Sequence, residues 1–136
     1  MNIKLIFLFL FIFSNSIEAS VFNEYTFING EQAKKKWGYE KLDKNKFRES
    51  GSKGDDVKAK MAAYILENQS YKGKKIELVY KELGKANGFF ISDIPPTYIL
   101  QRASNSHKES WQLAFIPTND GNFVEEVKIV KTCCNH

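Results

Sequence analysis

Along the second half of the chain, apolar positions recur first with the period of a helix and later with the alternation of a strand. One helical stripe consists of Val57, Met61, Tyr64 and Ile65, and a second of Ile76, Val79, Tyr80 and Leu83. Such spacing places each set on one face of a helix. Asp55 and Asp56 stand where an acidic N-terminal cap is favoured, and Gly84 stands where a helix stops. The pattern therefore predicts helices over residues 55–68 and 74–83.

After the second helix the pattern favours short strands joined by turns. The expected strands cover residues 88–92, 97–101, 111–116 and 123–130. Pro95 and Pro96 indicate a turn because neither can donate to a sheet ladder, and the Asn-Asp-Gly run at 119–121 predicts a hairpin. The polar segment 102–110 is expected to be a loop. Alternation fails at residues 125–126, which indicates a bulge or a twist in the last strand.

Helices gathered before an antiparallel sheet predict an α+β fold, in which two short helices pack on a three- to four-stranded sheet as a two-layer sandwich. Residues 21–30 favour a short strand or an ordered arm, residues 31–39 a helical turn broken by Gly38, and residues 41–54 a loop. The expected organisation is a signal peptide at 1–19, an arm or linker at 20–54, the α+β domain at 55–132 and a flexible tail at 133–136.

The N-terminus has the pattern of a cleavable export signal. Lys4 precedes an unbroken apolar run at residues 5–13, which is shorter than the about 20 residues of a membrane-spanning helix. This run is typical of the apolar core of a signal peptide, and the small residues after it predict cleavage after Ser16 or Ala19. Residues 14–20 contain no cysteine that could carry a lipid. We therefore expect a soluble periplasmic or secreted protein that does not span the membrane once cleaved.

The formal net charge of +4 permits binding to an anionic envelope surface. The lysines concentrate between residues 34 and 60, where the competing explanation is an ordinary solvated basic face. The sequence shows no nucleic-acid-binding motif, and nucleic acid is not an expected partner outside the cytoplasm. Another protein is therefore the expected partner.

Aromatic residues among lysines mark the candidate contact surface. The candidate contact residues are Lys34, Lys35, Lys36, Trp37, Tyr39 and Trp111. Tryptophan and tyrosine are enriched at the energetic centres of protein interfaces, which favours a contact role. The competing explanation is that Trp37 folds back over the sheet and belongs to the core.

Few side chains offer catalytic, redox or metal chemistry. His107 lies in a polar loop with serines at positions 104, 106 and 110, but catalysis needs a geometry that such a loop rarely holds. Cys133 and Cys134 are adjacent, so they could form a vicinal disulfide, pair with another chain or stay free. With His107 and His136 they offer soft metal ligands, but their spacing matches no zinc pattern. We therefore expect no enzyme activity, no cofactor and no metal.

The order of elements from residue 55 to residue 131 resembles that of a known family. Its marks are Gly73, Leu83-Gly84, Tyr98, Phe115 and Gly121, in two helices, a tyrosine-containing strand and a final hairpin. In these features the chain resembles the SmpA/BamE-type outer-membrane assembly lipoproteins and each half of the β-lactamase inhibitor protein. The resemblance implies helices on an antiparallel sheet and a non-catalytic role in presenting a sheet face or loops to another protein. The lipid-bearing cysteine of the lipoproteins is missing here, so membrane anchoring is not expected.

These patterns predict an exported bacterial protein-binding module without catalytic activity, acting in envelope assembly or as an enzyme inhibitor. One alternative is a small secreted hydrolase or redox protein that uses His107 or the pair Cys133 and Cys134. The other is a secreted effector or toxin-associated factor.

Overall fold

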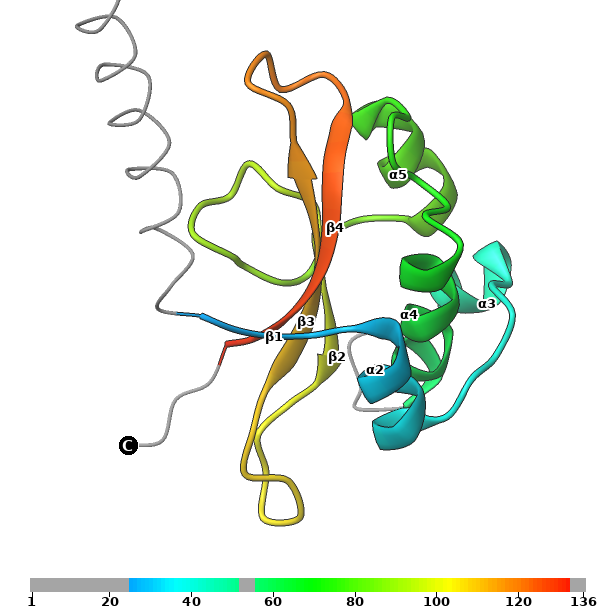
Figure 1. Ribbon diagram of the computed structural model, residues 1–136, viewed down its shortest axis with the longest axis vertical. Helices are drawn as coiled ribbons and strands as arrows, with labels where there is room; N and C mark the ends of the chain where they lie inside the picture. Colours follow the sequence, from blue (N-terminus) through cyan, green and yellow to red (C-terminus); the bar gives the residue numbers. More distant parts are fainter. Residues whose placement is uncertain (1–24, 52–55, 133–136) are drawn as a thin grey trace, which may run out of the picture.

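The computed structural model describes residues 25–51 and 56–132. The expected signal peptide, its two cleavage positions and the expected tail therefore lie outside the described residues. The described part is a four-stranded antiparallel sheet with four helices on one face (Figure 1). The strands are β1 (Thr26–Ile28), β2 (Thr97–Gln101), β3 (Trp111–Pro117) and β4 (Val124–Lys131), in the spatial order β1-β4-β3-β2. The helices are α2 (Gly30–Trp37), α3 (Lys44–Glu49), α4 (Val57–Glu67) and α5 (Ile76–Leu83). The α+β class is confirmed, with four helices where two were expected.

The two predicted helices are present as α4 and α5. Gly84 ends α5 with a positive φ of 86°, and its N–H donates to the Tyr80 carbonyl, as expected of a glycine at a helix end. The side chain of Asp56 makes no capping hydrogen bond, so its expected capping role is not found, and Asp55 lies outside the described residues. Helix α4 packs against α2, α3 and the sheet, which buries its alanines as well as Met61 and Ile65.

The segment expected as an arm or linker contributes a strand and two helices. Strand β1 pairs with β4, with Ile28 opposite Ile129. Asn29 then begins α2 with a capping box, in which its side chain and that of Gln32 each accept the other's backbone N–H. The expected loop at 41–54 instead contains α3, because Phe47 is fully buried against the core. A six-residue helix with one buried side chain leaves no recognisable periodicity in the sequence.

The three predicted strands from residue 97 onward are confirmed as β2, β3 and β4. Trp111, Leu113 and Phe115 alternate along β3 and are buried under the helices. The pairing of β3 with β4 shifts register between Ile116 and Pro117, so that Glu125 is an extra residue. The expected bulge therefore lies where the alternation fails.

The expected strand at 88–92 is wrong. Its residues form no ladder, and the bridge of this segment joins Phe90 to Ser92 within one tight turn. The segment instead leaves the sheet edge and crosses the sheet face opposite the helices (Figure 1). At that edge the Gly88 N–H donates to the Thr97 carbonyl and the Asn87 side chain accepts from the Ile99 N–H, which covers the outer side of β2.

The apolar residues divide into two clusters, one on each face of the sheet. The larger cluster fills the space between the helices and the sheet. The smaller one lies on the opposite face, where Phe90 is buried with Ala114 and Val130, and Tyr25 and Phe27 pack against them. The apolar run at residues 88–92 predicts a strand. The burial of Phe90 on this second face accounts for the apolar residue at that position without a strand.

A partly exposed polar cluster joins α3 to α5. The buried Tyr71 hydroxyl donates to Glu82 Oε2 at 2.8 Å, and Lys44 Nζ lies 2.9 Å from the same oxygen. Burial, with the hydrogen bond to Glu82, raises the pKa of the Tyr71 hydroxyl, so it remains a donor. Partial burial acts to raise the pKa of Glu82, but the hydrogen bonds from Lys44 and Tyr71 prevail and hold it below its usual value. The cluster therefore stabilises the ionised carboxylate.

Candidate functional site

The two tryptophans among the predicted contact residues belong to the core. Trp37 is 9% exposed, and its Nε1 donates to Gln101 Oε1 at 3.0 Å. Its ring meets that of the buried Trp111 edge to face, with 6.1 Å between the centroids. Trp37 therefore folds back onto the sheet, and neither tryptophan is an exposed anchor.

The remaining predicted contact residues form a small cationic surface around one exposed ring. Tyr39 is 44% exposed, and Lys34 Nζ lies 4.8 Å from the centre of its ring. Lys36 Nζ lies over both tryptophan rings and 3.9 Å from Glu109 Oε2, so its charge is engaged with the core. Lys35 is exposed. The structure thus separates the predicted set into a buried part and a peripheral part.

The serine hydroxyls near His107 hydrogen-bond to the backbone of the loop and not to the imidazole ring. Ser104 Oγ accepts from the backbone N–H groups of Ser106 and His107, each at 3.3 Å. Ser110 Oγ accepts from the Ala103 N–H at 2.9 Å. No hydrogen bond in the described part of the chain joins the His107 ring to these serines. Within residues 25–51 and 56–132, no three His, Cys, Asp or Glu side chains are grouped to hold a metal ion.

A conspicuous apolar surface lies on the segment of residues 88–96, called here the apolar loop. Phe89 is 54%, Ile91 46% and Ile94 68% exposed. Exposed apolar residues scattered singly are normal, but these three lie within one segment of nine residues. The sequence carried a signal for this loop in the apolar run before Pro95 and Pro96, and that run was predicted to be a strand.

The apolar loop is braced although its side chains are exposed. Phe90 is buried and meets Tyr25 edge to face at 4.9 Å, which anchors the loop on the sheet. The Phe89 N–H donates to Gln112 Oε1 at 2.8 Å, and Gln112 Nε2 donates to Thr132 Oγ1 at 2.7 Å. The exposed residues are therefore held on a fixed backbone.

Ile91 has a backbone conformation that β-branched residues rarely adopt. Its φ is +65°, and the Ser92 N–H donates to the Phe90 carbonyl at 2.7 Å. A bond between residues i and i+2 around a positive φ is the pattern of a strained γ-turn. Non-glycine residues held in such regions cost about 1–3 kcal/mol each, and they concentrate at ligand-binding sites. Isoleucine at this position is unfavourable for the fold itself.

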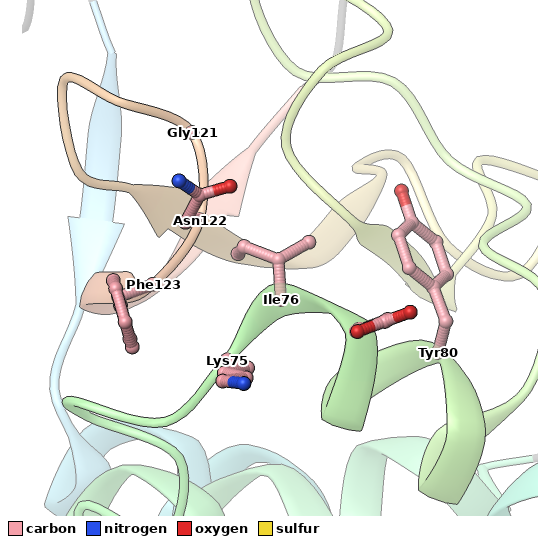
Figure 2. Close-up of a pocket in the computed structure, with 7 residues that line it drawn as sticks. Lys75, Ile76, Tyr80, Gly121, Asn122 and Phe123 are labelled. Carbon is pink, nitrogen blue, oxygen red and sulfur yellow. The ribbon is translucent and has the colours of Figure 1, made fainter.

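A second surface is a hollow of about 450 Å³ between the start of α5 and the β3–β4 turn. Its lining consists of Lys75, Ile76, Glu77, Tyr80, Gly121, Asn122 and Phe123. Figure 2 shows Ile76 between Phe123 and Tyr80, and both of these rings are exposed. The Ile76 N–H donates to the Asn122 carbonyl at 2.9 Å, which fixes the helix start against the turn. The apolar stripe of this helix includes Tyr80, but the structure buries Val79 and Leu83 and leaves the Tyr80 ring exposed at this hollow.

The chain matches no known protein-family model, no curated protein and no solved structure. The resemblance to the SmpA/BamE-type lipoproteins and the β-lactamase inhibitor protein therefore stays a prediction. Among the described residues, no helix combines the length and the apolar character needed to cross a bilayer.

Proposed function

We propose that this chain is an exported, non-catalytic protein-binding module that contacts its partner through the apolar loop. The observation that carries the proposal is Ile91, which is 46% exposed and held at a φ of +65°. Neither feature helps the fold, because nearly half of the residue stays exposed to solvent and the backbone is strained. A residue that is unfavourable for folding at such a position is explained by a role in binding.

The bracing of the loop supports the same role. A loop already fixed in one conformation loses little conformational freedom when it binds, so more of its contact energy appears as affinity. Phe89, Ile91 and Ile94 would then enter an apolar cleft of the partner, where exposed apolar side chains gain most from burial. This arrangement suits an inhibitor that fills an enzyme cleft as well as a subunit of an envelope assembly. Export is supported by the apolar run at residues 5–13 behind Lys4.

The test compares Ile91→Gly with the wild-type mature chain. Glycine relieves the positive φ and removes the exposed side chain, so we expect the variant to be as stable as the wild type or more stable by about 1 kcal/mol. We expect the variant to capture less of the specific partner from envelope extract than the wild type does, by a factor of at least about ten, because an interface anchor is lost. Quantitative mass spectrometry of the captured proteins measures the binding, and thermal unfolding measures the stability.

Tyr39→Ser is the matched control, because Tyr39 has a similar exposure (44%) and lies outside the apolar loop. Unchanged capture by the control, with capture lost in Ile91→Gly, supports the proposal. If Tyr39→Ser loses the partner while Ile91→Gly keeps it, the contact surface is the cationic one and the proposal for the loop fails.

A further inference from the structure

Two hollows adjoin each other on α5, the one shown in Figure 2 and a neighbour, and together they are called the groove. The neighbouring hollow, of about 410 Å³, is lined by Lys75, Glu77, Leu78 and Lys81, so the two share Lys75 and Glu77. Clefts that bind ligands have volumes of about 300–1,000 Å³, and both hollows fall in that range. The groove is therefore large enough for more than one apolar side chain.

The groove combines an apolar interior with a basic rim. Ile76 lies between the exposed rings of Tyr80 and Phe123, which come from two different elements (Figure 2). Lys75 and Lys81 line it, and Lys74 precedes them in an exposed position. None of these three lysines takes part in an ion pair of the described residues.

The nearby carboxylates compensate this positive charge only in part, since three lysines face two carboxylates, those of Glu77 and Glu82. Glu77 is the one acidic side chain in the lining of the two hollows, and Glu82, outside this lining, interacts with the charge of Lys81. Asp120 is close in sequence, but its carboxylate accepts from Thr118 Oγ1 at 2.6 Å and from the Asn122 N–H at 3.0 Å. These hydrogen bonds hold the pKa of Asp120 below its usual value and direct the carboxylate into its own turn. The rim therefore favours a ligand with negative charge.

We propose that this groove binds a peptide segment of another protein in which one or two apolar side chains are flanked by aspartate or glutamate. The apolar side chains enter between Tyr80 and Phe123, and the acidic ones face Lys75 and Lys81. An anionic lipid surface has the same charge, but membranes are bound by apolar side chains that protrude from a protein, and here they line a hollow. The site is independent of the apolar loop, which lies across the sheet from the helices (Figure 1). Two such surfaces would let one chain hold two protein segments.

The proposal is tested by selecting peptides from a random displayed library on the full mature protein. We expect the enriched peptides to contain an aromatic or aliphatic residue next to aspartate or glutamate. A synthetic peptide of the enriched sequence should bind at least about tenfold more weakly to Lys75→Glu and to Phe123→Ser, measured by fluorescence polarisation. Both residues are exposed, and glutamate is favourable near a helix N-terminus, so both variants should keep the wild-type circular dichroism.

The matched controls are Lys35→Glu, which makes the same charge change at an exposed position of α2, and Ile91→Gly in the apolar loop. Both should bind the peptide with the wild-type affinity, which separates this site from the proposed function. Recovery of no peptide, of peptides without acidic residues, or of peptides whose binding survives both groove variants overturns the proposal. So does binding of phosphatidylglycerol vesicles that is lost in Lys75→Glu, because it would assign the groove to a lipid surface.

Discussion

Replacing Trp37 with alanine is expected to destabilise the whole domain, although this residue lies in the segment that the sequence suggested as an arm. The indole is 9% exposed, packs on Trp111 and donates to Gln101. Removal of a buried aromatic side chain costs about 3–5 kcal/mol. A buried acceptor left without its donor costs about 1–3 kcal/mol, part of which is already contained in the first figure. Since domains of this size are stable by about 5–15 kcal/mol, the loss is a large fraction of the total.

The expected signal is a fall in Tm of at least about 12 °C, since 1 kcal/mol corresponds to about 4–8 °C in a small domain. Urea unfolding followed by far-ultraviolet circular dichroism gives the free energy and avoids tryptophan fluorescence, which the substitution itself changes. Trp37→Phe keeps a ring but loses the N–H to Gln101, so it should lose a smaller amount, about 1–3 kcal/mol. Tyr39→Ala, two residues further on, removes a 44% exposed ring that meets the ring of Tyr64 at 5.9 Å, so it should lose only about 0.5–1.5 kcal/mol.

One result would refute this reasoning. If Trp37→Ala unfolds cooperatively within about 0.5 kcal/mol of the wild type, then β1 and α2 do not belong to the cooperative unit. The interpretation of residues 20–54 as an arm or linker would then stand. If the loss of stability is large, a fall in partner capture by Trp37→Ala would report unfolding of the domain. The variant would then give no information about a binding contact of Trp37.

Two further predictions concern the loop brace and the polar cluster. Gly88→Ala would make its Cβ overlap with Gln112 Oε1 and approach the Thr97 carbonyl oxygen at 3.0 Å, so the Gln112 side chain must shift and give up the Phe89 N–H. We expect a loss of about 1–3 kcal/mol in thermal unfolding, and a loss under about 0.5 kcal/mol would contradict the brace. The pKa of Glu82 is lower in the folded state than in the unfolded chain, so its stabilisation is present above the unfolded value and lost as the pH falls through the folded value. Glu82→Gln should therefore lower Tm at neutral pH and flatten its decline in acid, with the exposed Glu77→Gln as control. Parallel curves for Glu82→Gln and the wild type would exclude this role of the pair with Lys44.

The candidate site was only partly predictable from the sequence. The aromatic residues around Lys34–Lys36 suggested a contact surface, but a tryptophan among lysines has the same appearance whether it faces solvent or the core. Burial of Trp37 depends on Gln101, which is 64 positions away along the chain. The apolar run at residues 88–92 predicts a strand and the structure shows an anchored loop, because a short apolar segment is compatible with both. The groove beside α5 gave no local signal, since its walls come from two separate elements.

What the sequence by itself determined is the local geometry: the periods of α4 and α5, the turn at Gly121, the glycine that ends α5, and the bulge near Glu125. These features follow from interactions between residues a few positions apart, which a pattern of apolar and polar positions records directly. The tertiary structure alone decided that β1 and α2 join the domain and that residues 88–96 cross the far face of the sheet. It also decided that α3 forms, because the burial of Phe47 stabilises this short helix. Each of these outcomes depends on burial against distant partners, and burial is a property of the assembled core rather than of any segment.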